Sequence, residues 1–283
     1  MSHAAALPLT DADVARYRED GAICIRGAFA PDWIERLGAA IDADMKVPGP
    51  MVRINTPTGK PGLFFVDFQL WQRHDACRDF VFTSPAADIA ARLMGANEVV
   101  YYHDHLLVKE PDTEERTPWH HDQPYYPIDG QQIVSLWLPL DAVSRDVCVE
   151  YVRGSHRWGR WFAPKFFRQG GVDLQVQDAR FEAVPDIDAE RGSHTFLSWD
   201  MEPGDVIAFH ALTLHGAPGN RSSSRRRRAW ATRWCGEDAR YATRVGQISP
   251  PLEGHGLQPG DKLACDLFPR VRPIAPDTSF RKS

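Results

Sequence analysis

The sequence predicts a mainly β protein with helices packed on the outside, built as an antiparallel barrel or as a jelly roll of two sheets. Helical patterns occur only before residue 98. The chain then changes to short runs rich in Val, Ile, Tyr and Trp, which Pro, Gly and Asp turns separate. The length of 283 residues suits one domain of this kind, because barrels and sandwiches often reach it. We therefore expect a single domain over residues 1–283.

Three helices are expected in the first part of the chain, over residues 10–19, 31–44 and 84–94. Thr10 with Asp13 three residues later matches a capping box, and Pro31 occupies the first helical position, where proline is tolerated. Apolar residues then recur at helical spacing, and Gly95 ends the third helix. Residues 48–62 are rich in Pro, Gly and Thr and predict a mobile loop.

Strands are expected over residues 99–109, 132–140, 147–152, 205–214 and 227–235. The predicted domain therefore has three parts: a mostly helical N-terminal part, a β core and a C-terminal extension, over residues 1–97, 98–240 and 241–283. Residues 164–194 are predicted to be an insertion in the core. An irregular segment of this length in a compact domain is usually functional, so we expect it to act as a lid.

Composition and charge exclude several classes of protein. A net charge of -5 at pH 7 does not suggest nucleic acid as a partner. No apolar run approaches the roughly 20 residues that span a bilayer, and the N-terminus lacks the pattern of a secretory signal. The five cysteines are scattered without a CxxC pair, which favours reduced thiols. We expect a cytoplasmic protein with no membrane contact.

Three side chains predict a metal site. His120 and Asp122 are two residues apart, so on a strand both would leave from the same face. His215, brought back by the fold, would complete a set of two histidines and one carboxylate. Such a set occupies one face of an octahedral metal and is typical of non-haem Fe(II) oxygenases, which bind a co-substrate and O2 in the open positions.

The sequence context favours iron over the alternatives. A lone histidine is more often structural than a ligand, but Pro118 and Pro124 flank the His120 motif and would stop a strand there. His215 follows an apolar run, and a basic cluster that suits an acidic co-substrate comes soon after it. Zinc hydrolases also use two histidines and a carboxylate, but they usually need a positioned base, as on HExxH helices. No such helix occurs here.

Other histidines are assigned by strand geometry. His121 would face away from His120, so we expect a residue that supports the pocket wall. His210 lies five residues before His215, an odd offset that places it on the opposite face, where it would pack. His105 shares a face with Leu107 and is expected to line the pocket.

The motifs in this order resemble the phytanoyl-CoA dioxygenase (PhyH-like) family of Fe(II)/2-oxoglutarate oxygenases. The matching segments are Pro118-Trp119-His120-His121-Asp122-Gln123, Ser135-Leu136-Trp137-Leu138-Pro139-Leu140, Arg153-Gly154-Ser155-His156, Gly204-Asp205-Val206-Ile207 and His215-Gly216-Ala217-Pro218-Gly219-Asn220 with the arginines that follow. They extend from the middle of the chain nearly to its end.

The resemblance implies a double-stranded β-helix, a cupin-like jelly roll, with Fe(II) held by His120, Asp122 and His215. It also implies that 2-oxoglutarate chelates the iron and that O2 is the oxidant. An arginine soon after His215 would bind the distal carboxylate, because a guanidinium pairs a carboxylate through two parallel hydrogen bonds. Counting from His215 gives Arg226, counting back from the next strand gives Arg227, and we lean to Arg226.

By position, Trp137, His105 and His121 resemble family residues near the 2-oxoglutarate pocket. The family often has Gln where His121 stands and Ser where Ala217 stands, so the hydrogen bonds made there differ. Halogenases of the family have a small residue at the position of Asp122. Because a carboxylate stands there, the resemblance implies hydroxylation, or a desaturating or ring-forming variant, with release of succinate and CO2.

The substrate is expected to be a small molecule, apolar or ring-bearing. Two aromatic clusters flank loops that would cover a barrel mouth: Phe64, Phe65, Phe68 and Trp71, and then Trp158, Trp161, Phe162, Phe166 and Phe167. Arg53, Lys60 or Lys165 would be placed to pair an acidic group. A binding module without catalysis and a protein hydroxylase remain as alternatives, and the sequence leaves the oligomeric state open.

Overall fold

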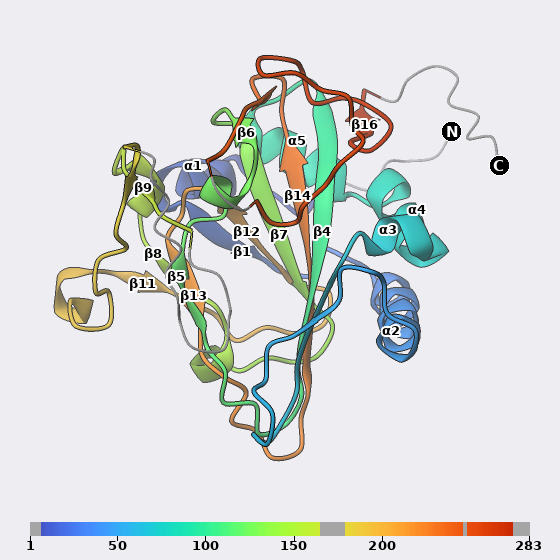
Figure 1. The fold of residues 1–283 in the computed structure, drawn as a ribbon, viewed down its shortest axis with the longest axis vertical. Helices are drawn as coiled ribbons and strands as arrows, with labels where there is room; N and C mark the ends of the chain where they lie inside the picture. The colour runs from blue at the N-terminus through green and yellow to red at the C-terminus, as the bar shows by residue number, and fades with distance from the viewer. Residues whose placement is uncertain (1–6, 165–178, 246–247, 274–283) are drawn as a thin grey trace.

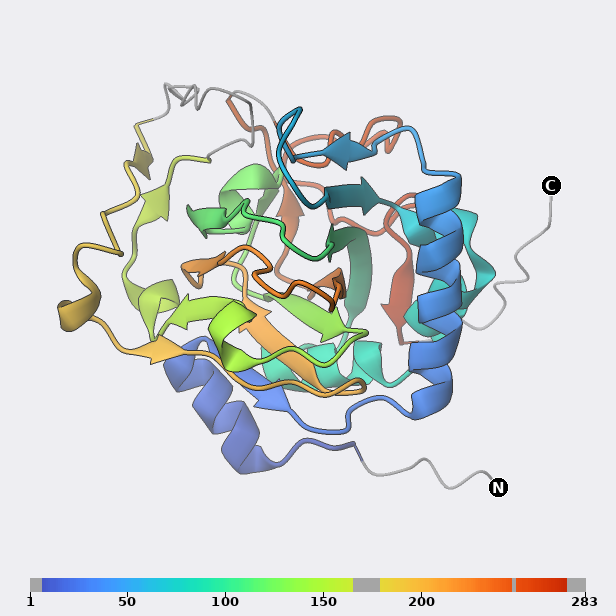
Figure 2. The same ribbon diagram turned by 90° about the horizontal axis from the view of Figure 1, so that it is seen from below.

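A computed structural model describes residues 7–164, 179–245 and 248–273, and it confirms the mainly β fold. Two antiparallel sheets face each other as a jelly roll, with helices on the outside. In Figure 1 the larger sheet stands in the middle, the smaller sheet lies to its left, and helices α2, α3 and α4 lie to its right. Seen from below, α1 and α2 lie on the periphery (Figure 2).

The major sheet has eight strands in the order β1-β12-β7-β14-β4-β3-β2, with β16 also paired to β4. Their bounds, in this order, are Ala22–Ile25, Val206–His210, Ile133–Pro139, Arg227–Cys235, Val99–Lys109, Phe64–Phe68, Arg53–Ile54 and, for β16, Arg270–Arg272. The minor sheet has the order β11-β8-β13-β5, with bounds Phe196–Leu197, Glu150–Val152, His215–Ala217 and Thr117–His120.

Two small ribbons complete the described strands. They pair β6 with β15 and β9 with β10, over Ile128–Asp129, Arg240–Tyr241, Trp161–Phe162 and Phe181–Glu182. The helices α1 to α5 cover Asp11–Asp20, Pro31–Lys46, Leu70–Arg73, Asp75–Thr83 and Ala86–Met94. Short 3-10 turns lie at Gln123–Tyr125, Arg145–Val147, Ser155–Arg157 and Arg191–Ser193.

The predicted helix signals act as expected at both ends of α1. The Thr10 side chain accepts a hydrogen bond from the Asp13 backbone, and the Asp13 side chain accepts one from the Thr10 backbone. Gly21 ends the helix with φ 83°, a left-handed conformation that glycine adopts without strain. A Cβ at this position would lie 2.4 Å from the His156 ring and 2.6 Å from Thr213 Oγ1, so the tight turn into β1 also requires glycine.

The two faces of the major sheet carry different cores. On β14, Trp230 and Trp234 point outward and are buried in a cluster with residues of the helices. Ala229 and Ala231, on the alternate positions, face the minor sheet and belong to the inner cluster. Small side chains on the inner face leave space between the sheets, and the cavity described below occupies it.

Several predicted boundaries were wrong. The expected loop over residues 48–62 contains β2, and β3 was not predicted. The run over residues 205–214 is not one strand, because β12 ends at His210 and a turn separates it from β13, which begins at His215. Of the predicted insertion over 164–194, residues 165–178 lie outside the described residues. The rest contributes β10 and a 3-10 turn.

None of the helices that the structure describes is both long and apolar enough to pass through a membrane.

Phe80 on α4 joins the helical layer to the major sheet. Its ring lies 4.8 Å from that of Phe29, 5.5 Å from Trp33 and 5.3 Å from Trp230. We expect Phe80→Ala to lower the free energy of unfolding by about 3–5 kcal/mol, because it removes a buried ring and leaves a cavity. Chemical denaturation measures this, with Phe80→Leu as the control that keeps most of the volume. Equal losses for the two variants would contradict the packing described.

Candidate metal centre

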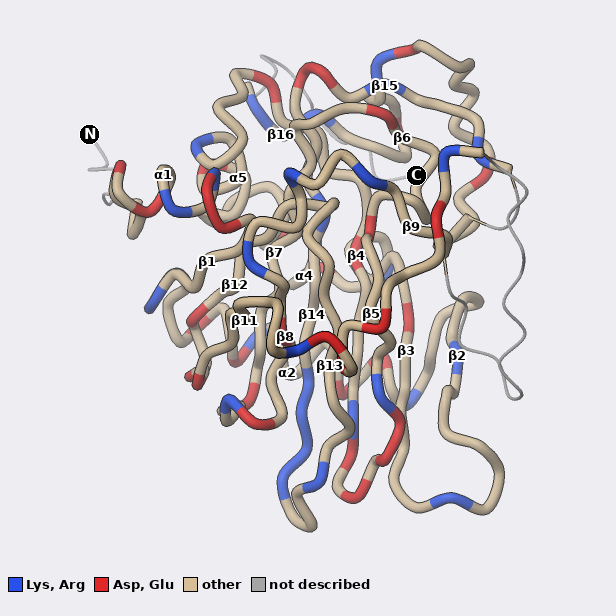
Figure 3. The backbone as a smooth tube through the Cα atoms, turned by 90° about the vertical axis from the view of Figure 1, so that its left-hand side faces the viewer, with Lys and Arg blue, Asp and Glu red and all other residues tan. Residues whose placement is uncertain are grey.

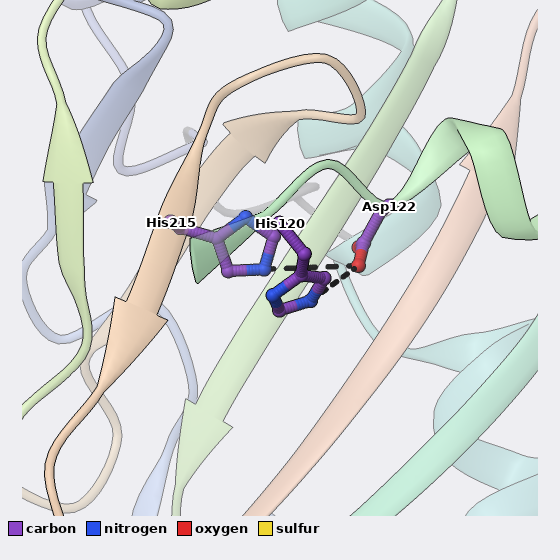
Figure 4. Close-up of side chains that lie close together, drawn as sticks. All are labelled: His120, Asp122 and His215. Atoms are coloured by element: carbon purple, nitrogen blue, oxygen red, sulfur yellow. Dashed lines mark ion pairs between the residues drawn. The ribbon is translucent and has the colours of Figure 1, made fainter. Parts of the chain in front are cut away.

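Three side chains converge between the two sheets. His120 ends β5, His215 begins β13, and the antiparallel pairing of these strands places the two residues opposite each other. Asp122 Oδ1 lies 3.5 Å from His120 Nε2 and 3.7 Å from His215 Nε2. One ligand atom from each residue fits within a 4.8 Å cluster (Figure 4). The structure thus brings together the predicted set of two histidines and one carboxylate.

Asp122 reaches the cluster by a different route from the one expected. The strand ends at His120, and Asp122 has a helical backbone, with φ -76° and ψ -46°, at the start of a 3-10 turn. The backbone N–H groups of Asp122 and Gln123 both donate to the carbonyl of Ala211, at 2.9 and 3.0 Å. The turn, fixed by the segment between β12 and β13, therefore directs the carboxylate; strand alternation does not.

Backbone carbonyls orient both imidazoles. His120 Nδ1 lies 2.8 Å from the Pro118 carbonyl, and His215 Nδ1 lies 2.9 Å from the Thr213 carbonyl. Because a carbonyl only accepts, each Nδ1 carries the proton and each Nε2 presents its lone pair toward Asp122. Neutral imidazole nitrogens and a carboxylate oxygen in this arrangement fit an Fe(II) ion.

The charges of the ligand set agree with this fit. Burial lowers the pKa of His215 to about 3, so the ring is neutral at neutral pH. Burial alone would raise the pKa of Asp122, but the Arg233 guanidinium opposes this effect, and the pKa lies well below its usual value. A neutral imidazole and an ionised carboxylate are the forms that bind a metal.

A cavity opens from the cluster between the sheets. Arg227 lies in its wall, as do Trp137 and His105, which were expected to do so. His105 stacks on Phe68, with ring centroids 4.4 Å apart. Of the described residues in the wall, Asp122 is the only acid.

The structure separates the two candidate arginines, because adjacent strand residues face opposite sides of a sheet. Arg227 is buried in the cavity wall, and its guanidinium donates to the Val147 carbonyl. Arg226 points to the outside and forms ion pairs with Glu110 and Asp42. The preference for Arg226 is therefore revised to Arg227.

Neighbours in the same basic run are also paired with acids. Arg228 pairs with Asp42 and Asp141. Basic segments of the backbone around the start of β14 accordingly lie among acidic ones (Figure 3). The run of arginines therefore places one guanidinium inside the cavity and two in outer ion pairs.

His121 is not part of the cavity wall, so its predicted place beside 2-oxoglutarate is corrected. Its ring packs on Phe162 at 4.6 Å, in an apolar cluster with Leu214 and Val152 on the other side of β5. Burial lowers its pKa to about 3. The alternation that turned His120 inward turns His121 away, as strand geometry alone predicts.

Several polar residues of the wall had not been singled out, among them His103, Tyr126 and Arg233. His103 shares the inward face of β4 with His105, and Arg233 shares the inward face of β14 with Arg227. Counting in steps of two along each predicted strand was the signal that would have found these two. Tyr126 follows the 3-10 turn, where no periodic pattern exists.

The fold and the cluster define an iron- and 2-oxoglutarate-dependent oxygenase of the jelly-roll type. Residues 17–229 match the model of the phytanoyl-CoA dioxygenase (PhyH) family, and the chain belongs to this family. Among relatives, rat peroxisomal phytanoyl-CoA dioxygenase is 23% identical over 251 residues, covering 81% of this chain and 69% of that protein. A match to the probable phytanoyl-CoA dioxygenase of Caenorhabditis elegans, 26% identical over 50% of this chain, spans 45% of that protein.

Two of the similar solved structures resemble nearly the whole chain. The non-heme alpha ketoglutarate dependent carbocyclase SnoK from nogalamycin biosynthesis is 27% identical with a TM-score of 0.71, covering 93% of this chain and 96% of that one. The epimerase SnoN from the same biosynthesis is 21% identical with a TM-score of 0.71, covering 94% and 96%. At 21% identity, the likeness to SnoN shows that the two chains share a fold.

Burial of neutral histidines predicts an acid-sensitive fold. Burial, and then Arg233, holds the pKa of His103 well below the usual 6.5. Below that pH the unfolded chain binds a proton that the folded chain does not, so stability present at neutral pH is lost as the pH falls. We expect His103→Phe to reduce the slope of unfolding free energy against pH below 6.5 by about 1.4 kcal/mol per unit, one proton's worth.

Denaturation of the metal-free protein at several pH values measures this slope. Tyr102→Phe is the matched control, because it changes a buried neighbour that does not titrate in this range. An unchanged slope in His103→Phe would show that this imidazole is protonated in the folded state.

Proposed function

We propose that this protein hydroxylates an aliphatic C–H bond of a small, apolar or ring-bearing molecule, with release of succinate and CO2. The observation that carries the proposal is one cavity whose wall holds a cluster suited to a metal and a buried arginine that pairs with no carboxylate of the described residues. In the proposal His120, Asp122 and His215 bind Fe(II). Iron, 2-oxoglutarate and O2 then supply the oxidant that removes hydrogen from the substrate.

Arg227 is assigned to the distal carboxylate of 2-oxoglutarate. Its guanidinium is buried, and within the described chain no carboxylate pairs with it. A buried cation without an anion is costly, so the wall is suited to a ligand that brings a negative charge. On the inward face of β14, Ala229 and Ala231 lie between Arg227 and Arg233, and the small side chain of Ala229 in the cavity wall leaves room for a slender molecule. Trp137 on β7 is paired with Ala231 and lines the cavity beside these residues.

The substrate is assigned to the side of the cavity that β3 forms. Phe64, Val66 and Phe68 of β3 line it with apolar surface. Of the described members of the two predicted aromatic clusters, only Phe64 and Phe68 lie in this wall; Phe65 and Trp71 pack in the outer core. Trp158 and Phe162 pack in the separate cluster beside β9, and Phe166, Phe167 and Lys165 lie outside the described residues.

Polar residues rim the substrate end. Arg53 belongs to β2, and Asn55 directly follows this strand. Tyr125 lies in the 3-10 turn and Ser249 in the C-terminal segment, and the backbone N–H of Ser249 donates to the Tyr125 carbonyl at 3.1 Å. Lys60, considered beside Arg53 as an anion contact, instead pairs with Glu114. In the proposal the rim orients the substrate, and the apolar wall excludes water around the reacting bond.

Hydroxylation is preferred because Asp122 supplies a carboxylate where a halogenase would leave room for halide. A ring-forming reaction is the second candidate, since the carbocyclase SnoK is 27% identical over nearly the whole chain. Both outcomes begin with removal of a hydrogen atom and differ only in what the substrate does next.

We also propose a small molecule rather than a nucleic acid as partner and a cytoplasmic location, which the five free cysteines support.

The product separates the two candidates. A panel of small ring-bearing molecules is incubated with the protein, Fe(II), 2-oxoglutarate and isotopically labelled O2, and succinate identifies accepted substrates. We expect a product that carries one labelled oxygen atom. A product that has lost two hydrogen atoms and gained no label would replace hydroxylation by ring formation or desaturation. His215→Ala is the control and should release no succinate, because one metal ligand is gone.

Adjacent arginines provide a matched pair for the co-substrate assignment. We expect Arg227→Gln to weaken 2-oxoglutarate binding to the Fe(II) protein by about 10- to 100-fold, because a charged hydrogen bond contributes about 1.5–3 kcal/mol. Arg226→Gln should leave it unchanged, since this side chain lies outside the cavity. Anaerobic titration, followed by the visible charge-transfer band, measures both. The reverse pattern would assign the carboxylate to Arg226.

A further inference from the structure

Asp122 presents only one of its two oxygens to the histidines, and the other is engaged by two donors. Oδ1 is the atom close to both imidazoles. Oδ2 accepts a hydrogen bond from Ser135 Oγ at 2.9 Å and lies 3.4 Å from Arg233 Nη2. All three side chains are buried, so water does not compete for the carboxylate.

The guanidinium of Arg233 is itself held in place. Nε donates to the Tyr126 hydroxyl oxygen at 3.0 Å, and Nη1 donates to the Ala231 carbonyl at 2.8 Å. Each of its three nitrogens therefore has a partner, and the plane of the guanidinium is fixed. Arg233 is the only cation in the cavity wall that pairs with Asp122 among the described residues.

The two donors are placed by one backbone pairing. Arg233 on β14 and Ser135 on β7 are directly opposite each other in the antiparallel register, and both face the cavity side. The orientation of the carboxylate is thus set by the sheet, whereas its position is set by the turn after β5. Two independent parts of the fold constrain one side chain.

We propose that Arg233 and Ser135 are positioning residues that keep Asp122 a one-oxygen ligand of the iron. With Oδ2 held, the carboxylate cannot turn to offer both oxygens to the metal. Bound Fe(II) would then keep positions open for 2-oxoglutarate and O2. The same contact occupies Arg233, which leaves Arg227 as the arginine for the distal carboxylate.

The test compares variants by iron binding before any turnover. Arg233→Met removes the charge and Ser135→Ala removes one hydroxyl, while Arg233→Lys keeps the charge without the fork. We expect Arg233→Met to weaken Fe(II) binding by about 10- to 100-fold, as outer partners of metal ligands do. Ser135→Ala should weaken it less, and Arg233→Lys should recover part of the loss.

A second readout distinguishes positioning from support of the fold. The charge-transfer band of the Fe(II)–2-oxoglutarate complex should shift in Arg233→Met and Ser135→Ala, because the ligand geometry changes. Arg244→Met is the matched control: it removes another buried guanidinium, paired with Asp129, that does not line the cavity. It should leave the affinity and the band as in the wild type.

This inference rests on the proposed function. The charge-transfer band of the wild-type protein distinguishes a failure of the proposed function from a failure of the positioning role. No band in wild type with Fe(II) and 2-oxoglutarate would overturn the proposed function itself. A normal wild-type band, with the same iron affinity and band in Arg233→Met and in Ser135→Ala, would overturn only the positioning role. Should Arg233→Met fail to fold, Ser135→Ala decides the question alone, because it changes a single atom of the contact.

Discussion

The buried carboxylate of Asp122 is the group on which the arrangement of the centre depends. An ionised carboxylate away from water costs several kcal/mol unless charges and hydrogen bonds replace its hydration. Here a serine and an arginine hold one oxygen, and the two imidazole nitrogens that would share a metal ion with the carboxylate face the other. The partners come from both sheets, so the carboxylate is satisfied only when the sheets are assembled in register.

The two-sided nature of β14 explains how a stable protein contains such a polar interior. Its outward residues, Trp230 and Trp234, bury large apolar area against the helices, where the core is tightly packed. Its inward residues are small or charged. The apolar driving force for folding therefore lies mainly behind the major sheet, and the space between the sheets is left for chemistry.

Part of the centre could be predicted from the sequence because two of its three residues, His120 and Asp122, are only two positions apart. The metal-binding set followed from His120 and Asp122 and a histidine before a glycine turn. The choice between Arg226 and Arg227 was not readable, because one extra loop residue shifts the register by one and reverses every side chain of a strand. Ser135 and Arg233 meet across a strand pair, and a single sequence carries no direct record of that pairing. β3 was missed because it is buried on both faces and so lacks alternation.

Part of the cavity rim lies outside the two sheets. His120, His215 and Arg227 lie on strands of the two sheets, whereas Ser249 belongs to a C-terminal segment outside them. Changes in this outer segment leave the strand register untouched. A substitution there can alter which molecules enter the cavity while the strands that carry His120, His215 and Arg227 keep their places.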